Sequence, residues 1–336
     1  MVAAARRALV TGCAGFIGSH LTESLLADGI DVVGVDCFNE NYGRREKLHN
    51  LVVSQEWDGF DFVPIDLSRG DLRDLVADTD VVFHLAAEPG VRASWGPHFG
   101  RYVRNNVMAT QQLLDAASEW PEKRLVFASS SSVYGQAESF PTPETATPRP
   151  LSPYGMTKLA AEHLCMLYHA NHGVDVTSLR FFTVYGPRQR PDMAFDIFCR
   201  AALREEPITV YGDGLQTRDF TYVGDVVRAL RLAAGNASAG GGIYNIGGGS
   251  QVGLRSIIDL LRELVATEVE VIYGQRQLGD VRDTGADTTR ARDELGFVPQ
   301  MTLREGLERQ FESVRRTAGT ASTASATRVS SRDASI

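Results

Sequence analysis

The first 180 residues alternate short runs of β-branched and apolar residues with longer segments of helical character. The short runs carry no polar alternation, so both faces of each strand have to be covered by other elements. A parallel sheet with helices on both sides provides that cover, which predicts an α/β fold with a doubly wound sheet. The predicted strands are 8–11, 31–36, 60–64, 80–85, 124–129 and 175–180, and the main predicted helices are 19–28, 103–118 and 154–172.

The rhythm loosens after about residue 180, where turn-forming and glycine-rich segments become frequent and one further helix is predicted at 257–266. We therefore expect the larger domain to comprise residues 1–180, with a return of the chain near 218–242. Residues 181–217 and 243–316 should form a smaller α/β substrate-binding lobe over the carboxyl ends of the strands. The segment 317–336 is rich in Ala, Ser and Thr without periodicity, which predicts a disordered tail.

Composition excludes several classes of partner. The formal charge of −8 offers no general attraction to nucleic acid or to anionic membranes, and no apolar run approaches the roughly 20 residues that span a bilayer. The four cysteines form no CxxC pair, which is typical of reduced thiols in a cytoplasmic protein. His169 and His172 share a predicted helix, but nothing else indicates a metal, and we expect none.

A glycine-rich turn joins the first predicted strand to the first helix. Gly12, Gly15 and Gly18 follow a GxxGxxG spacing, in which the glycines permit a tight turn, a close approach to a pyrophosphate and close packing of helix on strand. The helix amino terminus then presents free N–H groups to the phosphates. Asp36 ends the second strand, where a carboxylate accepts hydrogen bonds from a ribose diol and repels a 2′-phosphate. These features predict a Rossmann-type domain that binds NAD rather than NADP.

Further residues at strand ends are expected to line the same site. Asp66 and Leu67 end the third strand and would reach the adenine, although Asp66 is equally plausible as an ordinary helix N-cap. His84 is better explained as a hydrogen-bonded strand-end histidine than as a catalytic group. The cofactor residues predicted in addition to the three glycines and Asp36 are Phe16, Ile17, Asp66, Leu67, Leu85, Ala86, Ala87, Asn106, Tyr154 and Lys158.

A tyrosine and a lysine spaced YxxxK begin the predicted helix 154–172. The (i, i+4) spacing places the phenol of Tyr154 and the ammonium of Lys158 on one helical face. A cation beside a phenol lowers the phenol pKa, which would make Tyr154 a general base at neutral pH. Ser130, in a run of four serines that follows the fifth strand, could hold the same substrate oxygen. The three residues predict a Ser/Tyr/Lys catalytic set.

Together these residues resemble the extended short-chain dehydrogenases/reductases, the NAD-dependent epimerase/dehydratase family, which act on sugar nucleotides. The resemblance covers about residues 7–315 and rests on TGCAGFIGSH, HLAAEPGVRASW, SSSSVYG, YGMTK, RFFTVYGPRQRPDMAF, GDGLQTRDFTYVGD and YNIGGG. It implies that Tyr154 takes the proton of a sugar 4-hydroxyl while the C4 hydride passes to NAD. It also implies that Lys158 orients the nicotinamide ribose and that Ser130 is the active-site hydroxyl.

The residues beside Ser130 bear on which reaction follows oxidation at C4. In this family the 4,6-dehydratases carry an Asp-Glu pair and the decarboxylases a Glu at places where this chain has Ser131 and Ser132. Without those carboxylates the site looks suited to returning the hydride to the opposite face. The resemblance therefore implies a 4-epimerase that keeps NAD tightly bound and recycles it.

The segment around Thr183 and Arg190 resembles UDP-glucuronate 4-epimerases most closely, since UDP-glucose 4-epimerases usually have Asn where this chain has Thr183. The resemblance implies that Thr183 and Arg190, helped by the serine run, bind the sugar carboxylate, for which arginine is a bidentate partner. A phosphate or interlobe contact is the other interpretation of Arg190. The full set of predicted substrate residues is Arg92, Ser130, Ser131, Ser132, Thr183, Arg190, Val210, Tyr211, Arg218 and Arg276.

Alternative functions stay open at this point. UDP-glucuronate is the leading substrate, with UDP-galacturonate as product, and UDP-glucose or UDP-N-acetylglucosamine is the alternative. A UDP-glucuronate decarboxylase would lose CO₂, and a cofactor-sensing binding protein on the same fold would not need the Ser/Tyr/Lys set. The family resemblance also implies a homodimer formed through helices 103–118 and 154–172.

Overall fold

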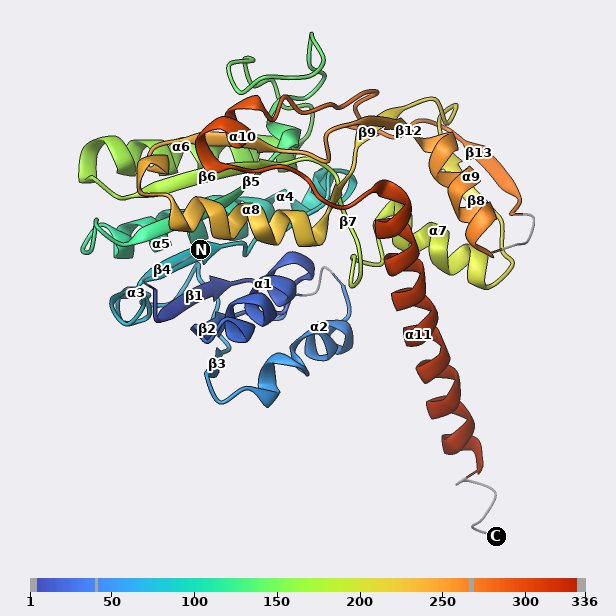
Figure 1. Ribbon diagram of the computed structural model, residues 1–336, viewed down its shortest axis with the longest axis horizontal. Coiled ribbons are helices and arrows are strands. Elements are labelled where there is room, and N and C mark those ends of the chain that lie inside the picture. The colour runs from blue at the N-terminus through green and yellow to red at the C-terminus, as the bar shows by residue number, and fades with distance from the viewer. Residues whose placement is uncertain (1–4, 40–41, 266–268, 331–336) are drawn as a thin grey trace.

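The computed structural model describes residues 5–39, 42–265 and 269–330. A large unit built on one parallel sheet is joined to a smaller unit, which lies on the right in Figure 1. The central strands are β1 (Arg7–Thr11), β2 (Asp31–Val35), β3 (Phe60–Val63), β4 (Val81–His84), β5 (Arg124–Ser130), β6 (Val176–Phe181) and β11 (Ile243–Ile246). The doubly wound α/β fold is confirmed.

The order of the strands places a crevice at one edge of the sheet. The seven-stranded sheet has the order β11-β6-β5-β4-β1-β2-β3, and neighbouring strands are parallel throughout. The chain builds outward from β1 to β3 and then returns to continue from β4 on the other side of β1. This reversal leaves a crevice beyond the carboxyl ends of β1 and β4, the position where doubly wound sheets bind their ligands.

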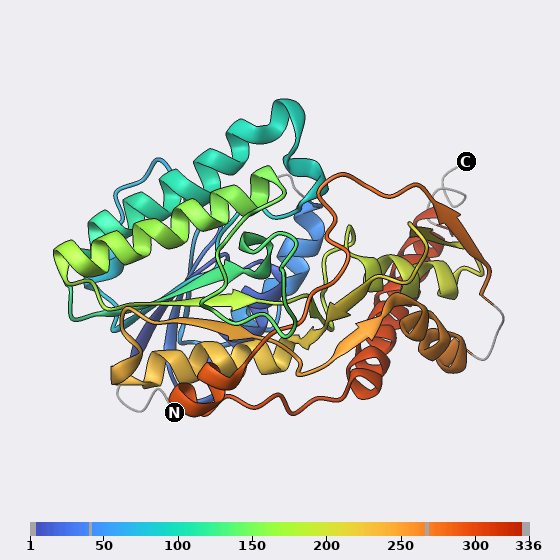
Figure 2. The same ribbon diagram turned by 90° about the horizontal axis from the view of Figure 1, so that it is seen from above.

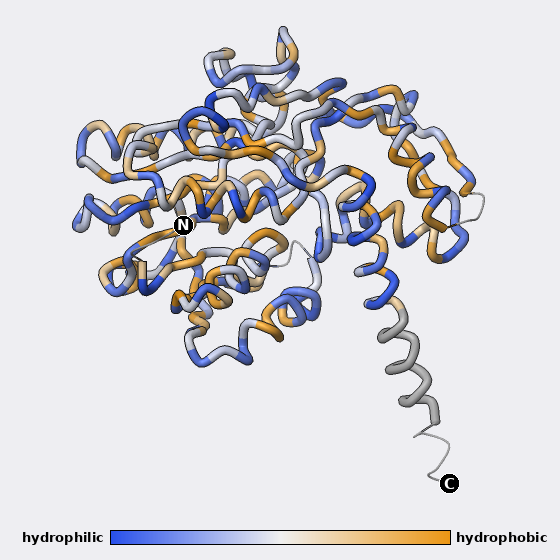
Figure 3. Tube along the Cα trace, in the orientation of Figure 1, coloured by the Kyte–Doolittle hydropathy of each residue, from blue (hydrophilic) through white to orange (hydrophobic). Residues whose placement is uncertain are grey.

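Helices cover both faces of the sheet because successive side chains of a strand point in opposite directions. In β1, Ala8 and Val10 pack into the core that holds α1 and α8, whereas Leu9 packs into the core that holds α5 and α6. Figure 2 shows α5 and α6 on one face of the sheet and α8 on the other. Figure 3 marks the hydrophobic residues along the chain in orange. The helices of the large unit are α1 (Phe16–Ala27), α2 (Arg44–Leu51), α3 (Arg73–Ala77), α4 (Phe99–Tyr102), α5 (Ala109–Ala117), α6 (Pro153–His172), α8 (Val223–Gly235) and α10 (Thr289–Leu295).

The smaller unit has its own apolar core, centred on Phe195, Phe198 and Ile257. Its helices and strands are α7 (Ala194–Leu203), β8 (Ile208–Tyr211), α9 (Leu254–Val265), β13 (Val271–Gly274) and α11 (Leu303–Ser330), and β13 pairs with β8 in parallel. Two short pairs connect the units, namely β7 (Val184–Tyr185) with β10 (Thr221–Tyr222) and β9 (Thr217–Asp219) with β12 (Gln251–Gly253).

Short helical turns complete the described elements. They are the 3₁₀ turns η1 (Ser54–Glu56), η2 (Arg92–Ser94), η3 (Gly96–His98), η5 (Ser131–Val133) and η6 (Ala237–Ala239), and the π-helical segment η4 (Val103–Met108). The single helix predicted for 103–118 is therefore π-helical over its first part. Among the described residues no helix is both long and apolar enough to cross a bilayer.

Three boundaries differ from the sequence prediction. The strand β11 (Ile243–Ile246) is the edge strand of the central sheet, paired with β6, although 243–316 was assigned to the smaller lobe. Leu295 and Phe297, at the end of α10 and just after it, also belong to the large unit, because their apolar partners lie in its core. In addition, α11 extends to Ser330 and so includes 317–330, where disorder was predicted. Residues 331–336 of that predicted tail lie outside the described residues.

Candidate active site

A pocket lies at the carboxyl ends of β1, β2 and β4, at the reversal of the strand order. The predicted residues that line it are Gly12, Gly15, Phe16, Ile17, Gly18, Asp36, Asp66, Leu67, Leu85, Ala86, Ala87, Tyr154, Lys158 and Arg190. Arg190 lies between β7 and α7, so a segment assigned to the smaller lobe meets the sheet at this pocket. These residues come from segments far apart in the chain, and the fold brings them to one pocket.

The glycine loop is as tightly packed as its sequence predicts. Gly12 has a φ of +73°, a conformation that glycine adopts without strain. A Cβ atom at Gly18 would lie 2.1 Å from the carbonyl oxygen of Gly12, so the first turn of α1 can approach the loop only without a side chain. Gly15 is the N-cap of α1, which leaves the free N–H groups of that helix directed at the pocket.

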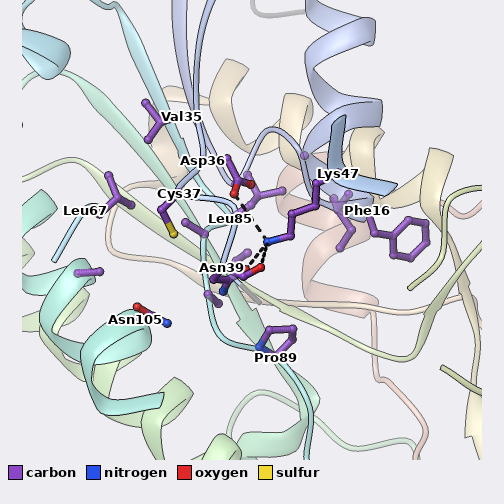
Figure 4. Close-up of a pocket in the computed structure, with 18 of the residues that line it drawn as sticks. Phe16, Val35, Asp36, Cys37, Asn39, Lys47, Leu67, Leu85, Pro89 and Asn105 are labelled. Carbon is purple, nitrogen blue, oxygen red and sulfur yellow. Dashed lines mark hydrogen bonds and ion pairs between the residues drawn. The ribbon is translucent and has the colours of Figure 1, made fainter. Parts of the chain in front are cut away.

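Asp36 and Lys47 form a buried ion pair at the β2 end of the pocket (Figure 4). The ammonium of Lys47 lies 3.8 Å from the Asp36 carboxylate, and the two side chains are 4% and 8% exposed. Asp36 also accepts a hydrogen bond from the backbone N–H of Phe38 at 2.8 Å. The remaining lone pairs of Asp36 face the pocket, as ribose recognition requires.

His84 at the end of β4 and Asp66 after β3 have different roles. His84 is buried and bonds to the hydroxyls of Thr11 at 2.8 Å and Thr110 at 2.9 Å, as expected of a structural histidine. Burial, with Lys158 nearby, lowers the pKa of His84 to about 3, so it stays neutral. Asp66 lines the pocket and accepts bonds from the N–H and the hydroxyl of Ser68 within a turn. It is not the N-cap of the next helix, since α3 begins at Arg73 with Leu72 as its N-cap, and its contact with the adenine stays a prediction.

The structure corrects the prediction for Asn106, which does not line the pocket. It was predicted to contact the cofactor, but its side chain is buried between helices: it accepts the N–H of Glu88 at 2.7 Å and donates to Thr157 at 3.0 Å. The neighbouring Asn105 lines the pocket instead. Both residues lie in the π-helical segment η4, whose changed turn shifts which asparagine faces inward, and two adjacent asparagines give no sequence signal of that choice.

The Tyr154 phenol lies close enough to Ser130 for the serine hydroxyl to lower the pKa of the phenol. Helix α6 begins beside them because Ser152 caps it, accepting the N–H of Gly155 at 3.1 Å, and Pro153 occupies its first turn. Lys158 follows one turn later, and its ammonium lies 4.3 Å above the centre of the Phe127 ring. The strand end of β5 and the start of α6 thus bring the predicted catalytic set together.

The electrostatics of Tyr154 differ from the sequence prediction. Burial raises the pKa of the phenol above its ordinary value, and the groups that oppose this rise are the Ser130 hydroxyl and the Arg190 guanidinium. The predicted lowering by Lys158 is wrong in this structure, because burial outweighs it and the Lys158 ammonium lies against the Phe127 ring. Arg190, which the YxxxK pattern does not contain, is therefore the cation that acts on the phenol.

Arg190 is held in a forked pair with Asp192. Its Nε and Nη2 donate to the two carboxylate oxygens of Asp192, each at 2.9 Å. Arg190 is 18% exposed, whereas Asp192 is 53% exposed. The guanidinium thus already has the bidentate geometry in which arginine binds a carboxylate.

The predicted substrate residues Ser130, Ser131, Ser132 and Thr183 are not among the residues that line the pocket, whereas their neighbour Ser129 is. Ser129 lines the pocket and donates to Glu162 at 2.6 Å, and Ser130 accepts the backbone N–H of Ser132 at 3.1 Å. Ser131 and Ser132 start the turn η5 directly after β5 and are only partly buried. Thr183 lies between β6 and β7, with its carbonyl accepting the N–H of Thr221 at 2.9 Å.

A second pocket lies between the units and contains Tyr211, Arg218 and Arg276. The Arg92 guanidinium lies 4.5 Å from the centre of the Tyr211 ring and pairs with Asp280 at 2.7 Å, so the large unit contributes to this pocket rim. Arg218 donates to backbone carbonyls, including that of Val281 at 2.7 Å. Val210 is a correction: strand alternation turns its side chain away from Tyr211 and into the core of the smaller unit, where it is 1% exposed.

Comparison with known proteins agrees with this geometry. The model of the NAD dependent epimerase/dehydratase family matches residues 8–247. The chain belongs to this family. It is 38% identical to the UDP-glucuronate 4-epimerase of Thermodesulfobacterium geofontis (90% of this chain, 94% of that protein) and 39% identical to the UDP-glucose 4-epimerase of Mycolicibacterium smegmatis (92% and 98%).

Solved structures of family members have the same fold. The UDP-glucuronic acid 4-epimerase of Bacillus cereus, in complex with UDP-glucuronic acid and NAD, superposes with a TM-score of 0.90 at 42% identity, over 93% of this chain and 99% of that one. MoeE5 in complex with UDP-glucose and NAD gives a TM-score of 0.83 at 45% identity, with the same coverage. The family resemblance inferred from the sequence motifs is confirmed.

Several pocket residues of this family member were missed by sequence reasoning. Asn39, Tyr42, Lys47, Pro89 and Asn105 all line the cofactor pocket. Lys47 lies in α2 as one of several charged residues, and nothing local distinguishes it from an exposed lysine. Among the described residues, no cluster of His, Cys, Asp and Glu has the arrangement of a metal site.

Lys158 should make the stability of the protein depend on pH. Burial lowers the pKa of its ammonium from 10.5 to about 8, so between these values the unfolded chain binds more protons than the folded one. The free energy of unfolding of the wild type, relative to Lys158→Met, should therefore rise by roughly 3 kcal/mol as the pH increases through this window. Chemical denaturation of both proteins across the window measures the difference, and parallel profiles would contradict the depressed pKa.

Proposed function

We propose that this chain is an NAD-dependent 4-epimerase that converts UDP-glucuronate to UDP-galacturonate through a 4-keto intermediate. The observation that carries the proposal is the placement of Arg190 in the same pocket as Tyr154 and Lys158. A cation beside the phenol at the sugar end of a dinucleotide site suits a substrate that carries a carboxylate next to the reacting carbon. The relatives named above that act on UDP-glucuronate support this choice.

The pocket residues fit NAD. The lack of a side chain at Gly18 lets α1 pack against the loop, and Gly12 and Gly15 of that loop line the pocket where a pyrophosphate would bind. Asp36 lines the same pocket and is an acceptor for a ribose diol. We assign the nicotinamide ribose to Lys158, whose ammonium is buried at the other end of the same pocket. NAD, when bound, supplies the acceptor and donor of the C4 hydride. Since the hydride returns within one catalytic cycle, we expect NAD to remain tightly bound.

Tyr154 moves the proton in this proposal. Its phenol takes the proton of the sugar 4-hydroxyl during oxidation and returns it during reduction, while Ser130 holds the same oxygen by its hydroxyl. The Arg190 guanidinium favours the phenolate and so assists proton removal. Release of the ketone from these groups lets the sugar present its other face before the hydride returns.

The carboxylate needs a firm partner. A 4-keto uronate is a β-keto acid that loses CO₂ when its carboxylate stands perpendicular to the ketone plane. We assign Arg190 and Thr183, with the serine run, to holding that carboxylate in a protective orientation. Ser131 and Ser132 occupy the places where dehydratases and decarboxylases of this family carry acids, so neither side reaction finds a carboxylate there.

The nucleotide half is assigned to the second pocket. Tyr211 presents an aromatic face for the uracil, and Arg92, Arg218 and Arg276 supply positive charge for the diphosphate. Burial lowers the pKa of Arg218, which nevertheless remains a strong base. Val210 has no part in this assignment, since its side chain lies in the apolar core.

A second candidate substrate is a neutral UDP-hexose, UDP-glucose or UDP-N-acetylglucosamine. The pairing of Arg190 with Asp192 favours it, because the arginine has a carboxylate partner without any substrate carboxylate.

We also propose a homodimer formed through α5 and α6, supported by the exposed apolar side chains of Met108 and Leu167 on that side of the large unit. A cytoplasmic location is supported by four cysteines that are all free.

The test is incubation of the purified protein with UDP-glucuronate and no added NAD, followed by product analysis by ¹H NMR. UDP-galacturonate without a UDP-pentose is the expected product, since the cofactor is recycled on the protein. Parallel incubations with UDP-glucose and UDP-N-acetylglucosamine provide the comparison. Conversion of a neutral sugar alone would establish the second candidate, and a pentose as the main product would establish a decarboxylase.

A further inference from the structure

The cofactor pocket has two walls that come from different parts of the chain. One wall is the loop that follows β2 and carries Asn39, and the other is the loop that follows β4 and carries Glu88. In the sheet the order is β4-β1-β2, so the glycine loop that follows β1 lies between these two walls. A contact between the two walls therefore joins segments on either side of the glycine loop.

Such a contact exists. The side-chain amide of Asn39 donates to the Glu88 carboxylate at 3.0 Å. On the β2 side, the Lys47 ammonium donates to the backbone carbonyl of Asn39 at 3.1 Å and to its side-chain oxygen, and also pairs with Asp36. Figure 4 shows Lys47 joined to Asn39 and to Asp36, with Asn105 and Pro89 across the pocket.

Glu88 is equally well anchored on the β4 side. Its carboxylate accepts from Arg101 at 2.8 Å and from Asn105 at 3.2 Å. Its backbone is fixed by Asn106, which accepts the N–H of Glu88 and donates to its carbonyl at 3.0 Å. This explains the buried position of Asn106: the residue predicted to contact the cofactor holds the opposite wall in place.

The bridge holds two carboxylates and two cations, of which only Arg101 is substantially exposed. Lys47 and Glu88 are each 3% exposed, and the carboxylates of Asp36 and Glu88 face the cations of Lys47 and Arg101. Buried ionic groups persist only where each has charged or hydrogen-bonding partners, and removing one partner leaves the others uncompensated. The bridge is therefore a defined contact rather than an adaptable surface one. Asn39 is its central member, since it bonds to both sides.

We propose that the Asn39–Glu88 bridge, anchored by Lys47, encloses the pyrophosphate of the bound dinucleotide against the glycine loop and so retains the cofactor through successive turnovers. Asn39 and Glu88 are positioning residues, remote from the phenol that handles the proton. The inference rests on the proposed function, because an epimerase restores its cofactor in each cycle and does not need to exchange it. An enclosed pocket would slow any dehydrogenase that must release NADH.

The experiment measures NAD release from the holoenzyme of Asn39→Ala. The protein is loaded with NAD and freed of excess by gel filtration, and the released NAD is then followed by mass spectrometry after rapid filtration. We expect release to be at least about tenfold faster than in the wild type, as the loss of a hydrogen bond to a charged group predicts. Activity should become dependent on added NAD, because the variant loses its cofactor between turnovers.

Two further variants complete the design. Asn171→Ala is the matched control and should release NAD at the wild-type rate, because this asparagine near the end of α6 bonds to the Leu167 carbonyl of its own helix and does not line the cofactor pocket. Glu88→Gln keeps the size of the side chain but removes the charge, and it tests the bridge from the other wall if Asn39→Ala does not fold. Release from the folded variants at the wild-type rate would overturn the proposal. NAD release is measured without any sugar. The test can therefore succeed or fail whether or not the protein epimerises UDP-glucuronate.

Discussion

Tyr154→Phe should lower the turnover of UDP-glucuronate about a thousandfold while leaving NAD binding intact. Positioned acid–base groups contribute roughly 10²- to 10⁴-fold to a rate, and the phenol is the group that contacts Ser130 at the reacting end of the pocket. The ring itself keeps its edge-to-face contact with Tyr102, at 6.4 Å between centroids, so the pocket wall survives the loss of the hydroxyl. Steady-state rates measured by separation of the two UDP-uronates check the effect.

The matched control for this prediction is Tyr168→Phe. Tyr168 lies on the same helix, and its hydroxyl bonds to Asp115 at 2.8 Å and accepts from Gln111, far from the pocket residues. This variant should retain near-normal turnover, which separates loss of the reacting hydroxyl from a general disturbance of α6. If Tyr154→Phe turned over UDP-glucuronate at a comparable rate, the proposed proton transfer would be wrong.

Arg190→Lys should reduce kcat/KM for UDP-glucuronate by about 10- to 100-fold. A bidentate charged pair is lost, and hydrogen bonds to charged groups contribute about 1.5 to 3 kcal/mol each. A lysine keeps the positive charge near Tyr154, so the effect on the phenol should be smaller than the effect on carboxylate binding. The fraction of UDP-pentose among the products should rise, because the keto acid is held less firmly.

The decisive comparison is between substrates. If Arg190 binds the carboxylate, kcat/KM for UDP-glucose should change much less than for UDP-glucuronate in the same variant. Equal losses on both substrates would instead assign Arg190 to the phenol or to an interlobe contact. Arg200→Lys is the control, since Arg200 also pairs with an aspartate, Asp196, but within α7 and outside the pocket.

The strands of the central sheet were predictable because each is a continuous apolar run whose burial is independent of details elsewhere. Their predicted ends agree with the structure within one or two residues, as for β1 and β6. The strand β11 was missed because a four-residue run among glycines resembles a loop, and only pairing with β6 makes it a strand. The π-helical turn of η4 was likewise invisible, because packing rather than composition selects it.

The candidate site divides in the same way. The glycine loop and the Tyr154/Lys158 pair are local motifs, and their spacing alone places their members together. Glu88, Asn39 and Lys47 come from three separate segments, and each has an ordinary local context. The influence of Arg190 on Tyr154 also could not be predicted, because it joins residues on either side of the pocket.

The amino-acid sequence by itself determined the doubly wound sheet, the glycine loop after β1 and the pairing of Tyr154 with Lys158 on one helix, since each depends on short-range periodicity or spacing. Only the tertiary structure decided which asparagine faces the pocket, which cation acts on the phenol and which side chains bridge the two walls. The physical reason is distance along the chain. Hydrogen bonds and charges act through a few ångströms of space, and the partners of Asn39, Glu88 and Tyr154 come within that range only after the chain has folded.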